Sequence, residues 1–123
     1  MSKILVVDDS KLARRFLTTP LRNAGHEVLE AKNGQEGLAT FREHSFDCIV
    51  SDLLMPVMDG PTFLGHVRGE SAIPVIVVSA DVQDSTRDLV HQLGVARFLN
   101  KPFKSDELLE AVSVSLESVE GNK

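Results

Sequence analysis

Three aspartates, a serine and a lysine stand where chemistry on a charged group could take place: Asp8, Asp9, Asp52, Ser79 and Lys101. Each stands at the end of a short apolar run, and the carboxyl ends of parallel strands meet at one edge of a sheet. Three carboxylates gathered there cannot all stay ionised without a nearby cation. Carboxylate oxygens at a partly open site suit Mg²⁺, which also accepts phosphate as a ligand. The pattern predicts a pocket that binds an anion around a hard metal ion, with one carboxylate placed as a nucleophile.

Each of these residues has a simpler interpretation when it is taken alone. Asp8 and Asp9 could cap the helix that follows them, Asp52 could start a loop, and Lys101 before Pro102 could be a surface lysine. The joint pattern favours the functional interpretation. Every strand end expected to face the crevice, except that of the edge strand, carries a suitable polar group.

The elements that must position these residues are strands in short apolar runs alternating with helical patterns. The runs predict strands over 4–7, 27–31, 47–51, 75–78 and 96–99. Because most of these runs are continuous rather than alternating, they predict strands covered on both faces, as in a parallel sheet. The helical patterns cover 10–24, 34–44, 60–68, 84–93 and about 106–119. Such alternation predicts an α/β fold: a three-layer, doubly wound (βα)5 parallel sheet with flavodoxin-like strand order 2-1-3-4-5.

Two details of the helices carry specific expectations. The first helix places Leu12 and Phe16, and also Ala13, Leu17 and Leu21, at i, i+4 spacing. Pro20 falls inside this helix, removes a backbone donor and predicts a kink or an early 3₁₀ ending. Ser105 is expected to be the N-cap of the last helix.

Composition and charge restrict the function classes. The sequence has 123 residues, the length of one domain, with 42% hydrophobic and 25% charged residues, as in a soluble globular protein. The net charge of −5 argues against nucleic-acid binding through a basic surface. No apolar run approaches the ~20 residues of a membrane span, and the N-terminus does not resemble a signal peptide, so we expect a cytoplasmic protein without membrane contacts. Cys48 is expected to be a buried small hydrophobe.

Four stretches resemble the receiver domain of two-component response regulators, the CheY-like family. They are ILVVDDS at 4–10, DCIVSDLLMPVMDG at 47–60, VIVVSA at 75–80 and FLNKPF at 98–103. The resemblance covers residues 3 to about 118, which implies a single receiver domain over 1–123 with the CheY-like form of the predicted fold.

The resemblance implies a role for each candidate residue. Asp52 would be the phosphoacceptor. Mg²⁺ would be bound directly by Asp9, by Asp52 and by the backbone carbonyl of Leu54, and Asp8 would act through a metal-bound water. Lys101, in a cis peptide with Pro102, would pair with the phosphoryl group and Ser79 would hydrogen-bond to it. Ser79 and Phe98 would form the switch, although many members of the family have tyrosine where this chain has Phe98.

The resemblance also implies partners and excludes others. The phosphoryl donor would be a phosphohistidine on a histidine kinase or a histidine phosphotransfer protein, and the output would be contact with a downstream protein in a phosphorelay. The chain would be no enzyme beyond catalysing its own phosphorylation and dephosphorylation. The basic residues Lys11, Arg14, Arg15 and Arg22 of the first helix form either a solvated face or a docking patch for an acidic partner.

Three alternatives to a stand-alone receiver differ from it in what they require of the sequence. A phosphatase with an aspartate nucleophile would need Asp-x-Asp after the first strand and a cap insertion, whereas this chain has the adjacent pair Asp8-Asp9. An electron carrier of the flavodoxin type would need a Ser/Thr-rich phosphate loop at that place. A receiver excised from a longer regulator remains open, and the mass of the native protein distinguishes it from the stand-alone protein.

Overall fold

A computed structural model describes residues 2–55, 57–80 and 84–121 as strands that alternate with helices. The strands are β1 (Lys3–Val7), β2 (Glu27–Ala31), β3 (Cys48–Ser51), β4 (Val75–Ser79) and β5 (Arg97–Asn100). The helices are α1 (Lys11–Asn23), α2 (Gly34–Glu43), α3 (Gly60–Glu70), α4 (Asp84–Gln92) and α5 (Ser105–Gly121). The predicted elements are therefore confirmed, with ends that differ by a few residues.

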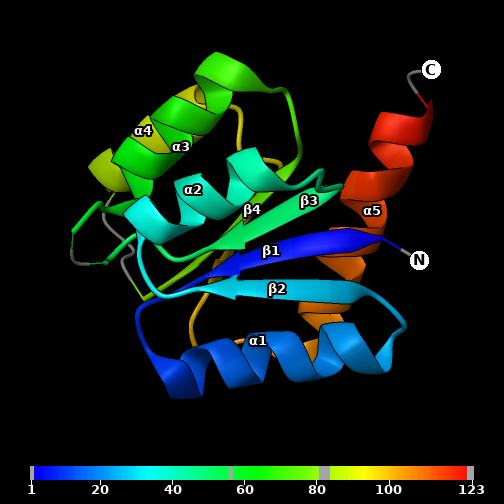
Figure 1. The fold of residues 1–123 in the computed structure, drawn as a ribbon. Helices are drawn as coiled ribbons and strands as arrows, with labels where there is room; N and C mark the ends of the chain where they lie inside the picture. The colour runs from blue at the N-terminus through cyan, green and yellow to red at the C-terminus, as the bar shows by residue number, and fades with distance from the viewer. Residues whose placement is uncertain (1, 56, 81–83, 122–123) are drawn as a thin grey trace.

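The five strands form one sheet with the order β2-β1-β3-β4-β5. Every pair of neighbouring strands is parallel, which confirms the predicted doubly wound topology. Helices α1 and α5 cover one face of the sheet, and α2, α3 and α4 cover the other (Figure 1). Strand order reverses between β1 and β3, so the carboxyl ends of these two strands flank the crevice where such sheets bind ligands.

Two apolar clusters hold the layers together. Successive residues of a strand point to opposite faces, so Ile4 and Val6 of β1 pack with α1 and α5, whereas Leu5 and Val7 pack with α2 and α3. Cys48 is fully buried in the first of these clusters, as expected, and burial raises the pKa of its thiol to about 12. The central strands thus form a rigid base for the residues at their ends.

Helix α1 departs from the sequence-based expectation in two ways. The sequence places two sets of apolar residues at i, i+4 spacing on this helix. Leu17 and Leu21 of one set are buried, but Leu12 and Phe16 of the other are 63% and 62% exposed. The expected early ending at Pro20 is wrong, because the helix continues to Asn23 and the Pro20 carbonyl accepts a hydrogen bond from Ala24 at 3.1 Å. The donor that Pro20 lacks would have paired with the Phe16 carbonyl. Phe16 lies on the exposed side of α1, where water can satisfy that carbonyl.

The start of α5 is one residue earlier than predicted. Ser105 is already helical, and the Glu107 carboxylate accepts a hydrogen bond from the Lys104 backbone N–H at 3.0 Å. This reach from the third helical residue back to the cap position is half of a capping box, so the prediction of Ser105 as N-cap is wrong. Among the described residues, no helix is both long and apolar enough to span a membrane.

Candidate functional site

Backbone hydrogen bonds extend the sheet past the strand ends and place the candidate side chains. The Asp8 N–H donates to the Ala31 carbonyl at 3.1 Å, and the Asp52 N–H donates to the Val7 carbonyl at 2.9 Å. The Lys101 N–H donates to the Ser79 carbonyl at 3.0 Å. These bonds tie β1 to β2, β3 to β1 and β5 to β4, and all three lie at the same edge of the sheet. The side chains that follow the strands therefore share one crevice.

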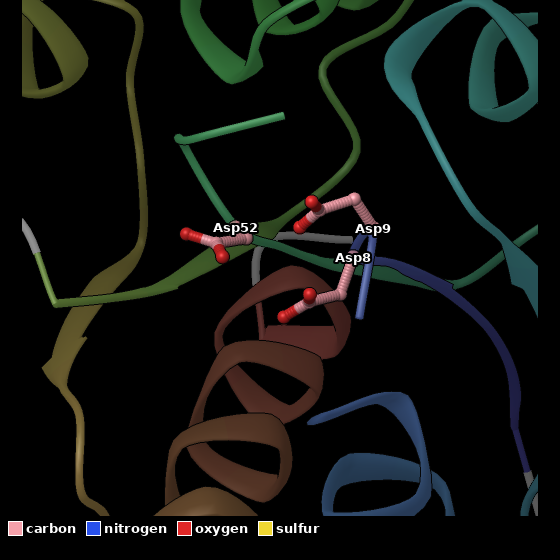
Figure 2. Close-up of side chains that lie close together, drawn as sticks. All are labelled: Asp8, Asp9 and Asp52. Atoms are coloured by element: carbon pink, nitrogen blue, oxygen red, sulfur yellow. The ribbon is translucent and has the colours of Figure 1, made fainter. Parts of the chain in front are cut away.

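The three predicted carboxylates do meet there. Asp8 and Asp9 come from the end of β1 and Asp52 from the end of β3, and their carboxyl groups surround one space (Figure 2). One oxygen of each lies within 4.8 Å of the others. Asp8 is fully buried, Asp52 is 6% exposed and Asp9 is open to solvent. Three hard oxygen donors at a partly open site fit Mg²⁺, which keeps some of its waters.

Lys101 joins two of these carboxylates. Its Nζ lies 2.9 Å from Asp8 Oδ2 and 3.0 Å from Asp52 Oδ2. Burial raises the pKa of the Asp8 carboxyl, and the Ser10 N–H and the Lys101 ammonium offset this only in part. Burial opposes the charged form of Lys101, but its hydrogen bonds to Asp8 and Asp52 together outweigh this and raise the pKa of its ammonium. Lys101 therefore stays protonated and balances part of the negative charge.

The second oxygen of Asp52 faces backbone donors. Asp52 Oδ1 accepts hydrogen bonds from the Leu53 N–H at 2.7 Å and from the Leu54 N–H at 3.4 Å. The Leu53 side chain is buried, whereas that of Leu54 is 59% exposed at the mouth of the site. Asp52 is thus held between an ammonium and two amides, which are the groups that stabilise charge on an oxyanion.

Two glycines allow the loop after Asp52 to lie close to its neighbours. A Cβ on Gly60 would lie 2.6 Å from the Asp52 carbonyl oxygen and 2.5 Å from the Leu53 Cα, closer than real side chains approach. A Cβ on Gly34, at the start of α2, would overlap the Met58 carbonyl oxygen, to which the Gly34 N–H donates at 3.1 Å. The loop from β3 to α3 is therefore clamped by backbone contacts on both sides.

The two predicted switch residues occupy different places. Ser79 is fully buried at the end of β4 and pairs with Asn100 of β5. Phe98 lies opposite Val77 of β4, two residues before the Ser79–Asn100 pair, and is half-buried against the apolar cluster that includes Val90 of α4. The Arg87 guanidinium lies 4.9 Å above the Phe98 ring and donates to Asn100 Oδ1 at 3.1 Å. The Lys101–Pro102 peptide is cis, as expected.

Sequence reasoning missed two arginines. Arg87 was not singled out, because nothing in its neighbourhood shows that it reaches across to Phe98. Arg14 was grouped with the basic residues of α1, but its Nη1 donates to the Asp8 backbone carbonyl at 2.7 Å. The signal was its position six residues after Asp8, which puts it in the turn of α1 that faces back to β1. Composition alone does not distinguish it from the exposed Arg15.

Comparisons with known proteins agree on one family. The family described as the response regulator receiver domain matches residues 4–113. KdpE, a transcriptional regulatory protein of Escherichia coli, is 38% identical over 116 residues, which are 94% of this chain and 52% of that protein. PilH of Pseudomonas aeruginosa is 34% identical over 94% of this chain and 98% of its own length. The chain spans about half the length of several curated relatives that it matches.

A solved structure shows the same fold. The chemotaxis protein CheY4 of Vibrio cholerae superposes with a TM-score of 0.88 and is 34% identical, over 94% of this chain and 98% of that one. The strand order described above thus occurs in a chain that is similar to CheY4 in sequence and in architecture.

Proposed function

The chain belongs to the family of response regulator receiver domains, and from this premise we propose that it is a switch phosphorylated on Asp52. The observation that carries the proposal is the Lys101 ammonium, which bridges Asp8 and Asp52 at 2.9 and 3.0 Å beside the exposed carboxylate of Asp9. Receiver domains are signalling proteins rather than enzymes in the usual sense. The donor that we propose is a phosphohistidine on a histidine kinase or a histidine phosphotransfer protein.

The proposed step is a phosphoryl transfer in which Asp52 is the nucleophile. A carboxylate oxygen of Asp52 forms the new P–O bond while the P–N bond to the donor histidine breaks, and the imidazole leaves. Lys101 and the amides of Leu53 and Leu54 already point at the Asp52 carboxylate. They can therefore stabilise charge on the transferring group without large rearrangement, which is the main requirement of this chemistry.

The proposed metal ligands follow from the donor set. Asp9, Asp52 and the Leu54 backbone carbonyl would hold Mg²⁺, with Asp8 acting through a water. When bound, the ion supplies positive charge that neutralises the carboxylates and the transferring phosphoryl group. This charge is needed because three carboxylates face a single ammonium in the crevice. The chain's own contribution is to hold these oxygens within reach of one another.

The proposed output is a change in protein contacts on the face formed by α4, β5 and α5. Ser79 would hydrogen-bond to the phosphoryl group, and Phe98 would turn inward behind it. PilH, which this chain matches over 98% of that protein's length, is a relative of receiver size in which such an output would be made by the receiver itself. The same chemistry would serve a receiver joined to an output domain, as the length of KdpE suggests for that relative.

Intact-mass analysis after treatment with acetyl phosphate and Mg²⁺ tests the proposal. The wild-type protein should gain one phosphoryl group, and Asp52→Asn or an excess of EDTA should abolish the gain. Asp106→Asn is the matched control, because Asp106 is an exposed carboxylate in the first turn of α5, outside the crevice. Persistent labelling of Asp52→Asn would refute Asp52 as the acceptor.

A further inference from the structure

Arg14 is the unusual member of the basic set on α1. Its side chain is only 15% exposed, whereas that of Arg22 on the same helix is 49% exposed. A guanidinium is costly to bury unless its donors find partners. The partners of Arg14 are therefore informative about why this residue points inward, toward the strand ends.

One partner belongs to the site itself. Arg14 Nη1 donates to the backbone carbonyl of Asp8 at 2.7 Å. This carbonyl is part of the peptide group that joins Asp8 to Asp9, so its orientation determines where the Asp9 carboxylate lies relative to that of Asp8. The N–H of Asp8 is already held by Ala31. With Arg14 on the other side, the backbone at Asp8 is held by both of its polar groups.

The other partner holds Arg14 from the side of β2. Arg14 Nε donates to Glu30 Oε1 at 3.2 Å. The guanidinium is therefore fixed between the Glu30 carboxylate and the Asp8 carbonyl. Arg22 shares the same carboxylate, with Nη2 at 3.3 Å from Glu30 Oε2, but its other hydrogen bond in the described part of the chain goes to the Val28 carbonyl and not to Asp8.

We propose that Arg14 is a positioning residue for the metal site: it holds the Asp8–Asp9 peptide so that both carboxylates face the same ion. This inference rests on the proposed function, since it assumes that Mg²⁺ binds at these aspartates. Groups that hold metal ligands from outside typically change metal affinity about 10–100-fold when they are removed. Arg14 would act in this way through the backbone rather than through a ligand side chain.

The test compares two variants, Arg14→Gln and Arg22→Gln, each titrated with Mg²⁺. Binding is monitored through the amide NMR signals of Asp9, Ser10 and Leu53, and the dissociation constant is measured by calorimetry. Both variants lose a bond to Glu30, but only the first loses the bond to the Asp8 carbonyl. We expect Arg14→Gln to weaken Mg²⁺ binding at least about tenfold and to shift the Asp9 amide signal even without Mg²⁺. Arg22→Gln should leave the dissociation constant unchanged.

A third variant guards against a folding defect. Arg14→Lys keeps the charge but has one ammonium for two partners, so it should restore part of the affinity. Unaltered Mg²⁺ affinity in a folded Arg14→Gln, or equal weakening in Arg14→Gln and Arg22→Gln, would overturn the role of Arg14. If Arg14→Gln fails to fold, wild-type affinity in Arg14→Lys together with a shifted Asp9 amide signal would overturn it, because the Asp8–Asp9 peptide would then have moved without any effect on the ion. Wild-type protein that does not bind Mg²⁺ at all would instead overturn the proposed function on which this inference rests.

Discussion

Val57 carries backbone strain in the loop that follows the proposed acceptor. Its φ of +67° makes it the one non-glycine residue with positive φ in the part of the chain that the structure describes. The left-handed region costs an L-residue about 1–2 kcal/mol, and a β-branched side chain fits it poorly. Because the Val57 side chain is 68% exposed, burial does not compensate for the strain. The strain lies between Asp52 and Gly60, the residues that this loop must keep close.

Relieving that strain should stabilise the protein. Val57→Asn is expected to raise the free energy of unfolding by about 1 kcal/mol, because asparagine tolerates positive φ. Denaturant melts measure the change. Val57→Thr is the matched control, since threonine is also β-branched and keeps the strain. Equal stability of the two variants would show that the φ angle at this position contributes nothing.

At the scale of the elements, helix α1 shows that tertiary packing can outweigh the helix-breaking tendency of a proline. Pro20 lies within a helix that continues to Asn23, because Leu17 and Leu21 are buried on one side. This burial outweighs the local cost of an interior proline. The sequence could not show this outcome, since a stop at Pro20 would satisfy the same local pattern. The kink expected at Pro20 stays a prediction.

Replacing Pro20 should therefore stabilise α1. Pro20→Ala restores the donor to the Phe16 carbonyl and should raise the free energy of unfolding by about 1–3 kcal/mol. Thr19→Ala, at the exposed neighbouring position, controls for the helix preference of alanine. Chemical denaturation of the two variants and the wild type gives the comparison. A Pro20→Ala protein no more stable than Thr19→Ala would mean that the helix accommodates Pro20 without strain.

Helix α4 is anchored at one end by an arginine from α3. The Arg68 guanidinium donates to the carbonyls of Leu93 at 2.6 Å, Gly94 at 3.1 Å, Ile73 at 2.6 Å and Ser71 at 3.3 Å. The first two follow the C-terminal end of α4, and the others connect α3 to β4. We therefore expect a rearrangement of α4 to pivot about this end.

Arg68→Lys tests the anchor. A single ammonium cannot serve four carbonyls, so we expect a loss of about 1–3 kcal/mol of stability. Amide hydrogen exchange should become faster along residues 84–94. Arg42→Lys is the control, because Arg42 pairs with Glu70 on the exposed surface and such pairs contribute little. Exchange in α4 that stays at the wild-type rate would contradict the anchoring role.

For the molecule as a whole, the topology and the central site could be predicted from the sequence. Parallel strands bring their carboxyl ends to one edge, so Asp8, Asp9 and Asp52 had to meet once the strand order was known. Contacts made by long side chains could not be predicted in this way. Arg14 and Arg87 reach partners on other elements, and four or more rotatable bonds leave many alternatives open until the packing is known.

The whole-molecule prediction concerns how a signal at Asp52 reaches the far face. Burying a fully exposed phenylalanine is worth roughly 1.5–3 kcal/mol, but Phe98 is already half-buried, so only part of this gain is left. The exposed cation–π contact with Arg87, worth about 0.5–1 kcal/mol, opposes the inward rotation, so we expect the ring to turn inward only once space opens behind Ser79. Beryllofluoride with Mg²⁺ should shift amide NMR signals across residues 84–100, and Ser79→Ala should reduce these shifts.

Two comparisons make that experiment decisive. Arg87→Gln removes the contact above the ring and should increase the fraction of inward Phe98 in the unphosphorylated protein. Shifts confined to the loops that carry Asp9, Asp52 and Lys101 would mean that the signal leaves through another face, with α1 as the nearest one.

The exposed side chain of Leu54 has a practical consequence for spectroscopy. The chain contains no Trp and no Tyr, so phenylalanine is its only source of intrinsic side-chain fluorescence. Leu54 projects into solvent while its backbone N–H lies 3.4 Å from Asp52 Oδ1. An indole placed there would be the sole chromophore of its kind, next to the group whose charge changes. Each arrival of a metal ion or a phosphoryl group could then be followed in real time as a change in emitted light.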